Sequence, residues 1–237
     1  MIDVSIILPC LNEAETVANC INKAKVCLDK SSFSYEVILA DNGSTDGSVE
    51  IAKNLGVRII KVPEKGYGAA ILAGLKNAEG QFIVIADSDD SYDLGIANLF
   101  IETLADGHDL VLGCRFPKLG GEIIPGAMPH LHRYVGTPIL SWLVRILFKT
   151  DIADINCGYR GLQKSFSEKL DLKSSGMEFA SEMIVKAVLL KGRMKQIPIT
   201  LHPDGRKNSQ SHLKPFRDGL RHVSLILKFF FRNPVKH

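Results

Sequence analysis

Short apolar runs recur through the first half of the chain, and stretches with helical spacing separate them. Val and Ile dominate the runs, which lie at residues 4–9, 35–42, 57–63, 82–89 and 109–115. The helix-like stretches cover about residues 14–29, 46–55, 68–78 and 95–106. Because the runs are continuously apolar rather than alternating, they predict strands that are buried on both faces. This half therefore predicts an α/β fold with a Rossmann-like, mostly parallel sheet and helices on both faces.

The pattern changes beyond residue 115. Residues 120–138 are rich in Gly and Pro and predict a long irregular loop, whereas residues 176–192 predict a helix and residues 196–201 a short strand. Two further segments, 139–149 and 216–234, combine apolar with basic residues, and neither approaches the ~18–20 apolar residues of a membrane span. Their composition favours helices that lie in a membrane interface, and packing into the core is the alternative.

Charge is distributed unevenly along the 237 residues. Residues 1–110 contain 8 Lys and Arg against 17 Asp and Glu, whereas the rest of the chain contains 21 basic and 9 acidic residues. We therefore expect the first part to meet cations and the second to meet anions, such as phosphates or an anionic membrane. The alternative is that unrelated solvated faces produce the imbalance by chance.

The cysteines and the start of the chain bear on the compartment. Five cysteines are irregularly spaced and form no CxxC pair, which predicts structural thiols in a reducing, cytoplasmic environment. The first ten residues enter an apolar run without the basic region of a signal peptide, which agrees with that prediction. Hydrophobic content of 46% is enough for one large domain over residues 1–237.

Polar residues follow three of the predicted strands. They are Asn12 and Glu13 after the first run, Asp41 and Asn42 after the second, and Asp87 and Asp89 after the fourth. In open α/β sheets, ligands bind beyond the carboxyl ends of the strands. We therefore expect these side chains to converge on one site.

Asp87 and Asp89 are the strongest candidates for chemistry. Two carboxylates one residue apart at a strand end can both face a hard cation such as Mg²⁺ or Mn²⁺, and substrate phosphate oxygens usually complete the coordination of such an ion. An EF-hand is excluded by spacing, because the sixth position from Asp87 is Tyr92 rather than Gly and the twelfth is Asn98 rather than Glu. Solvated acids at a helix start are the remaining alternative.

A glycine-rich phosphate loop is not indicated elsewhere. The stretch GYGAA at residues 66–70 lacks the P-loop pattern, and Ile71 stands where a dinucleotide fingerprint requires Gly. The stretch is either a tight turn that opens a helix or a turn whose backbone N–H groups face donor phosphates.

Four motifs in residues 4–93 resemble those of family 2, GT-A-fold glycosyltransferases. They are SIILPCLNEAETV, ILADNGSTDGS, GYGAAILAGLKNAEG and FIVIADSDDSYD. The strongest resemblance is to the dolichyl- or polyprenyl-phosphate hexose (mannose or glucose) synthases. Shorter stretches of the second half, GCRF, GAMPHLHR, CGYR and GMEFASEM, are also similar to membrane-associated members. The resemblance implies a single GT-A domain with a nucleotide-sugar and metal half (1–115), an acceptor half (116–215) and a basic apolar helix (216–237).

The resemblance also implies roles for individual residues. On the donor side, the nucleotide contacts would be Pro9, Asn12, Glu13 and Asp41, and the metal ligands would be Asp87 and Asp89 of the DxD element, with Ser91 where a glutamine is common. Near the acceptor loop, Arg115 and Arg133 would be the phosphate contacts. Arg206 and Ser211 match a basic-and-serine motif that would close over either the donor phosphates or the lipid phosphate. A later motif departs from the family pattern, because Ser209 replaces a glycine and His212 a lysine.

The implied reaction is inverting transfer of a hexose from a UDP- or GDP-sugar to a polyprenyl or dolichyl phosphate at the cytoplasmic membrane face. A lipid phosphate is already ionised, so it needs little help from a base. A hydroxyl acceptor, the alternative for a soluble glycosyltransferase, would need a carboxylate base, for which Asp90 is the best-placed candidate. Peripheral membrane contact is expected and nucleic acid is not, and the sequence is compatible with a homo-oligomer.

Two other classes fit less well. A sugar nucleotidyltransferase also uses an acidic metal site, but it normally carries a glycine-rich basic signature near its first strand, and PCLNEAE is not one. A nucleotide-sugar-binding module without catalysis is disfavoured by the intact Asp87 and Asp89.

Overall fold

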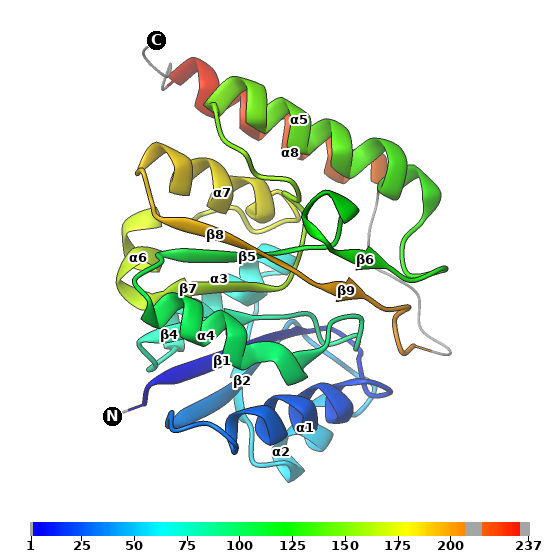
Figure 1. The fold of residues 1–237 in the computed structure, drawn as a ribbon. Coiled ribbons are helices and arrows are strands. Elements are labelled where there is room, and N and C mark those ends of the chain that lie inside the picture. Colours follow the sequence, from blue (N-terminus) through cyan, green and yellow to red (C-terminus); the bar gives the residue numbers. More distant parts are fainter. Residues whose placement is uncertain (1, 207–214, 233–237) are drawn as a thin grey trace.

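The computed structural model describes residues 2–206 and 215–232, and a sheet of seven strands forms its centre (Figure 1). The strand order is β3-β2-β1-β4-β7-β5-β8. Neighbouring strands are parallel except around β7, which is antiparallel to both β4 and β5. The bounds are β1 Val4–Cys10, β2 Tyr35–Asp41, β3 Arg58–Lys61, β4 Phe82–Ile85, β5 Leu110–Cys114, β7 Arg160–Gln163 and β8 Met194–Pro198.

Side chains alternate between two apolar clusters, one on each face of the sheet. In β1, Ile6 and Leu8 belong to one cluster and Ile7 to the other, as the period of two along a strand requires. Helices α1 (Val17–Leu28), α2 (Ser48–Asn54) and α4 (Ala97–Ala105) contribute to the first cluster. The second cluster takes residues from α3 (Tyr67–Asn77), α5 (Thr137–Phe148), α6 (Lys164–Leu170), α7 (Phe179–Leu189) and α8 (Pro215–Arg232).

The predicted mostly parallel sheet with helices on both faces is confirmed, including all five strands of the first half. The second half differs from the prediction in three ways. Residues 120–138 are not wholly irregular, because β6 (Glu122–Ile123) and a π-helical turn (His132–Gly136) lie within them. The single strand predicted at 196–201 is two, β8 in the main sheet and β9 (Thr200–Leu201), which pairs with β6. Finally, β7 and α6 were not predicted.

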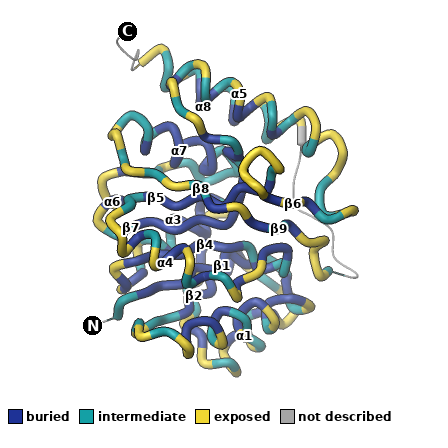
Figure 2. Tube along the Cα trace, viewed as in Figure 1, coloured by how far each residue is buried: buried dark blue, intermediate teal, exposed yellow. Residues whose placement is uncertain are grey.

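Helices α5 and α8 lie side by side as an outer layer beyond α7 (Figure 1). Within the described residues, no helix combines the length and the apolar composition that a membrane crossing requires. In Figure 2 the strands are mostly buried, while much of the outer surface of α5 and α8 is intermediate or exposed. All five cysteines are buried free thiols, which confirms the structural role predicted for them.

Candidate functional site

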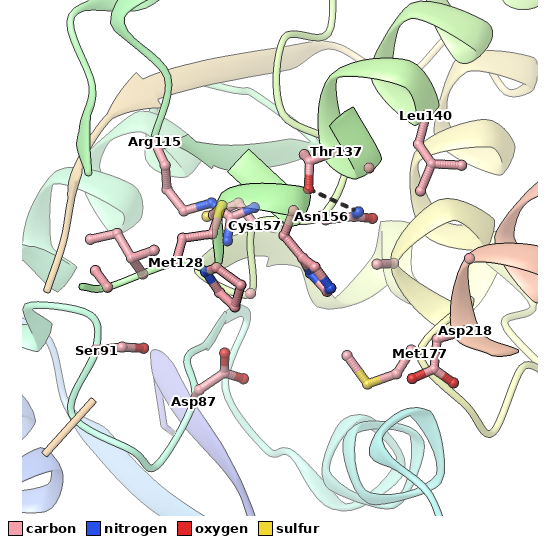
Figure 3. A pocket seen from close by; sticks show the side chains of 18 of the residues that line it. Asp87, Ser91, Arg115, Met128, Thr137, Leu140, Asn156, Cys157, Met177 and Asp218 are labelled. Carbon is pink, nitrogen blue, oxygen red and sulfur yellow. Dashed lines mark hydrogen bonds between the residues drawn. The ribbon is translucent and has the colours of Figure 1, made fainter. Parts of the chain in front are cut away.

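A cavity of about 720 Å³ lies beyond the carboxyl end of β4, which is within the usual size range of small-molecule sites. Most of its wall comes from the segment after β4, residues 126–140, the loop before β7 and the first turns of α8. The start of α3, the end of β5, the start of α7 and residues 201–206 complete it. Figure 3 shows Asp87 and Ser91 on one side, Arg115 and Asn156 on the opposite side, and Asp218 on a third. The Asn156 side-chain amide donates to Thr137 Oγ1 over 3.4 Å.

Asp87 lies in this cavity one residue beyond the end of the buried strand β4. The Tyr67 hydroxyl donates to its Oδ1 over 2.9 Å. On the other side Gly158 packs so closely that a Cβ there would come within 2.5 Å of Oδ2, so a larger residue would displace the carboxylate. Burial, followed by the negative charge of Asp89, raises the pKa of Asp87 to about 7. A bound divalent cation would offset both effects.

Asp89 is held by its neighbours on both oxygens. The main-chain N–H and hydroxyl of Ser91 donate to Asp89 Oδ1 over 3.1 and 2.6 Å. Its Oδ2 lies 3.5 Å from the Arg206 guanidinium. Ser91 therefore orients the carboxylate in this structure, and its role as a direct metal ligand stays a prediction.

The two aspartates fit a hard divalent cation. Within residues 2–206 and 215–232, no group of three His, Cys, Asp or Glu side chains could hold a metal. Two carboxylates would leave the other coordination positions to substrate oxygens and water, which is the usual arrangement for Mg²⁺.

Arg206 connects the metal candidates to Glu13. Its guanidinium forms two hydrogen bonds with the Glu13 carboxylate, one of them over 2.9 Å, and lies 3.3 Å from Asp204. Burial alone would lower the pKa of Arg206, but its bonds to Glu13 and the charge of Asp89 raise it. The structure thus links Glu13 and Asp89, two residues that the sequence predicted to converge, through Arg206, whose partners the sequence did not predict.

Three further predicted residues fix the loops after β1 and β2. The main-chain oxygen of Pro9 accepts from Ser88 over 2.7 Å. Asn12, with a φ of 59°, donates its N–H to Ser44 over 2.9 Å, and Asp41 Oδ1 accepts from the N–H of the same Ser44 over 2.9 Å. They lie at the same sheet edge but do not line the cavity described above. Their contact with a nucleotide stays a prediction.

Arg115 lines the cavity as half of a buried ion pair. It forms a two-pronged contact with Asp154, over 2.7 and 2.8 Å. Burial opposes the charged form, but Asp154 raises the pKa of Arg115 well above its usual value. The guanidinium is therefore fixed in place, with part of its charge offset.

Two more predicted residues, Asp90 and Arg133, do not line the cavity. Asp90 has a φ of 61° and turns toward α1, where it accepts from Asn19 and pairs with Lys23 over 2.8 Å, so the structure gives no support to the base role considered for it. Arg133 lies in the π-helical turn with its guanidinium 5.4 Å from the Tyr134 ring centroid, outside the cavity lining. Ser211 lies outside the described residues, as do Ser209 and His212.

Sequence reasoning missed Arg160, which lines the cavity. Its buried guanidinium donates to the main-chain oxygens of Ile155, Cys157 and Ala180, over 2.9, 2.7 and 3.0 Å. Because these partners are carbonyls, the positive charge is not neutralised by them. The CGYR motif was the available signal, but nothing in it distinguishes a cavity arginine from a surface one.

His222 of α8 gives the cavity wall a pH-dependent element. Its Nδ1 lies 2.6 Å from Ser181 Oγ. Burial and then the charge of Arg160 lower the pKa of His222 to about 4, from 6.5. The unfolded chain therefore binds more protons than the folded one between these values, so stability falls as pH is lowered through this window.

We expect the variant His222→Gln to lose less stability than the wild-type protein as the pH is lowered. Between pH 7 and pH 4.5, the wild-type protein should lose up to about 3 kcal/mol more unfolding free energy than the variant. Urea unfolding at several pH values measures the difference, in which contributions from the carboxylates cancel. Parallel pH profiles for the two proteins would contradict the assignment.

The family model of glycosyl transferase family 2 matches residues 5–160. Among curated relatives, the low-salt glycan biosynthesis hexosyltransferase Agl6 of Haloferax volcanii is 37% identical over 94% of this chain and 52% of its own length. The dolichol-phosphate mannosyltransferase of Pyrococcus furiosus is 26% identical over 95% of this chain and 64% of its own length. The chain thus spans about half to two thirds of the length of these relatives.

Solved structures show the same fold. Glucosyl-3-phosphoglycerate synthase from Mycobacterium tuberculosis, in complex with phosphoglyceric acid, superposes with a TM-score of 0.73 at 20% identity, covering 95% of this chain and 79% of that one. A second structure of that protein, solved with Mn²⁺, UDP and glucosyl-3-phosphoglycerate, gives a TM-score of 0.70 at 19% identity, with the same coverage of both chains. With the family match and this superposition, the chain belongs to glycosyltransferase family 2 and has the GT-A fold.

Proposed function

We propose that this protein is a metal-dependent glycosyltransferase that moves a hexose from a nucleotide sugar to the phosphate of a polyprenyl or dolichyl phosphate. The observation that carries the proposal is the position of Asp87 and Asp89 at the edge of a largely apolar cavity that also contains Arg115, Arg160 and Arg206. Such a cavity offers metal ligands for a diphosphate and cations for a second anion. The names of the Agl6 hexosyltransferase and the dolichol-phosphate mannosyltransferase support the reaction class.

On the donor side, Asp87 and Asp89 would hold Mg²⁺ or Mn²⁺, which supplies charge neutralisation for the departing diphosphate when it is bound. Tyr67 keeps Asp87 oriented and Ser91 keeps Asp89 oriented. The Mn²⁺ and UDP in the superposed synthase structure support this use of the site.

On the acceptor side, the chain has to align one anion with another. A phosphate oxygen would attack the anomeric carbon directly, and a single displacement inverts that centre. The ionised phosphate needs no proton acceptor, so the work of the protein is orientation and charge compensation. Arg160 provides positive charge on the cavity wall, and Arg115 does so in part because Asp154 is its partner.

The lipid would reach the cavity along α5 and α8. Ile139, Trp142 and Ile146 of α5 are each more than half exposed and are spaced three and four residues apart, so they share one face of the helix. Phe216 and Leu220 of α8 line the cavity and are also strongly exposed. We propose that this face rests in the membrane interface, on the inner side of the membrane.

The only tryptophan of the chain, Trp142, reports on this contact. We expect its fluorescence to shift to the blue when vesicles of anionic phospholipid are added. The double variant Ile139→Ser, Ile146→Ser should weaken vesicle binding by about tenfold, because two apolar side chains no longer enter the interface. Val26→Ser on α1, where Val26 is 55% exposed, is the matched control. An unchanged spectrum at saturating lipid would exclude the proposed face.

Transfer of labelled sugar tests the proposal. Polyprenyl phosphate in detergent, Mn²⁺ or Mg²⁺ and a panel of UDP- and GDP-hexoses should give label in an organic-extractable product with one donor, and chelator should remove it. Label that stays in the aqueous phase with every donor would contradict the lipid acceptor.

A hydroxyl acceptor is the second candidate, and one observation favours it. Asp218 places a carboxylate on the cavity wall (Figure 3), where a hydroxyl nucleophile would use a base. Soluble saccharides in the same transfer assay would then become labelled in place of the lipid.

A further inference from the structure

In this structure, three side chains that are expected to contact ligands contact one another instead. Asp89 is expected on the metal, Arg206 on a phosphate and Glu13 on the nucleotide. In the structure, the Arg206 guanidinium forms two hydrogen bonds with Glu13 and lies 3.5 Å from Asp89 Oδ2. The side chains of Arg206, Glu13 and Asp89 are only 10%, 6% and 17% exposed, so water screens these contacts little.

These contacts compete with the contacts that Asp89 and Glu13 are expected to make with a metal and a nucleotide. Asp89 Oδ1 already accepts two hydrogen bonds from Ser91, and Oδ2 faces Arg206. A divalent cation on Asp89 would therefore lie close to the guanidinium, where two positive charges repel strongly. Both oxygens of Glu13 are likewise engaged by Arg206, so a nucleotide that binds Glu13 competes with the guanidinium for the same carboxylate.

We propose that Arg206 is an internal counter-cation of the DxD site, which the metal and the nucleoside diphosphate displace together. The metal takes the place of the guanidinium at Asp89, the guanidinium moves to the diphosphate oxygens, and Glu13 is released to the nucleotide. A planar guanidinium pairs as well with two phosphate oxygens as with a carboxylate, so the exchange replaces one two-pronged contact by another. No covalent bond changes in this step.

The exchange couples the two ligands. Metal alone has to displace Arg206 without offering it a new partner, and a diphosphate alone enters beside Asp87 and Asp89 without charge neutralisation. Each ligand therefore strengthens binding of the other by the same factor. This inference rests on the metal and nucleotide part of the proposed function and is independent of the acceptor.

Mn²⁺ binding without turnover tests the exchange. Free Mn²⁺ is measured by its EPR signal, in titrations of wild type and Arg206→Gln with and without UDP. Without UDP, we expect the variant to bind Mn²⁺ about tenfold more tightly, because the competing charge is gone. With Mn²⁺ present, UDP should bind the variant at least about tenfold more weakly, because its guanidinium contact is lost.

Two further variants control for net charge and for folding. Arg58→Gln removes the same charge at the amino end of β3, where Arg58 pairs with Glu36 and Glu79, and should leave Mn²⁺ binding unchanged. Arg206→Lys keeps the charge and should bind Mn²⁺ alone as the wild-type protein does. It should bind UDP more weakly, because a lysine cannot form the two-pronged contact of a guanidinium. This variant keeps the test available if Arg206→Gln does not fold.

The outcomes separate the two proposals. Unchanged or weaker Mn²⁺ binding by Arg206→Gln without UDP would overturn the exchange, even if UDP and Mn²⁺ bind wild type together. Tighter Mn²⁺ binding by Arg206→Lys without UDP would also overturn it, because the charge is retained. Failure of UDP to bind wild type with Mn²⁺ present would instead overturn the donor part of the proposed function.

Discussion

Asp89→Ala is expected to lower the rate of sugar transfer at least about a thousandfold, because charge on the departing diphosphate is no longer neutralised by a metal at this position. The variant also removes the acceptor of both Ser91 hydrogen bonds and one neighbour of Arg206. Initial rates with labelled donor at saturating Mn²⁺ measure the loss. The effect should appear mainly in kcat, since the contact matters most as the leaving group departs.

Asp93→Ala is the matched control for this prediction. Asp93 lies four residues after Asp89 and is exposed. It accepts a hydrogen bond from the Gly95 N–H over 2.8 Å at the start of the short 3₁₀ turn Leu94–Ile96. Its removal should cost about 1 kcal/mol of stability and leave the transfer rate unchanged. A near wild-type rate for Asp89→Ala would mean that the DxD element does not hold the metal.

Asp154→Ala is expected to destabilise the protein by about 3–5 kcal/mol, since it leaves the Arg115 guanidinium buried without its carboxylate. Asp154 is 1% exposed and also accepts from the main-chain N–H groups of Arg115 and Asn156, each over 3.2 Å. The variant therefore loosens the loop that forms the cavity wall as well as the ion pair. Urea unfolding measures the change in free energy.

Glu50→Ala provides the comparison on the surface. Glu50 pairs with Lys53 over 2.8 Å with its side chain 70% exposed, so its removal should change stability by less than about 1 kcal/mol. If Asp154→Ala and Glu50→Ala had equal effects, the Arg115–Asp154 pair would not be the structural element inferred here.

The strands β1, β2, β4 and β5 of the first half could be predicted because they are largely buried on both faces and therefore read as continuous apolar runs, whereas β3 is a partly exposed edge strand. β7 could not, because its four residues, RGLQ, include an arginine, a glycine and a glutamine. Its place between β4 and β5 is set by antiparallel pairing with partners far away in sequence, such as Ile83 with Leu162. Such pairing leaves no local pattern in a short strand.

The site was predictable where it follows from strand direction. Asp41 and Asp87 could be placed at one edge because parallel strands end together. The direction of a single side chain could not be read, and Asp90 turns to α1 although Asp89, its neighbour, faces the cavity. Partners distant in sequence were equally hidden, as for Arg115 with Asp154 and Arg206 with Glu13.

Transfer to polyprenyl phosphate compared with polyprenol tests the central claim most directly. The two lipids share their chain and differ only in the phosphate that we propose as the nucleophile. Assayed with Mn²⁺ and the preferred nucleotide sugar, polyprenyl phosphate should become labelled and polyprenol should not, because the reaction relies on an ionised nucleophile rather than on a base. Equal labelling of polyprenol, or labelling of a soluble saccharide alone, would contradict the account and place a hydroxyl acceptor in the cavity.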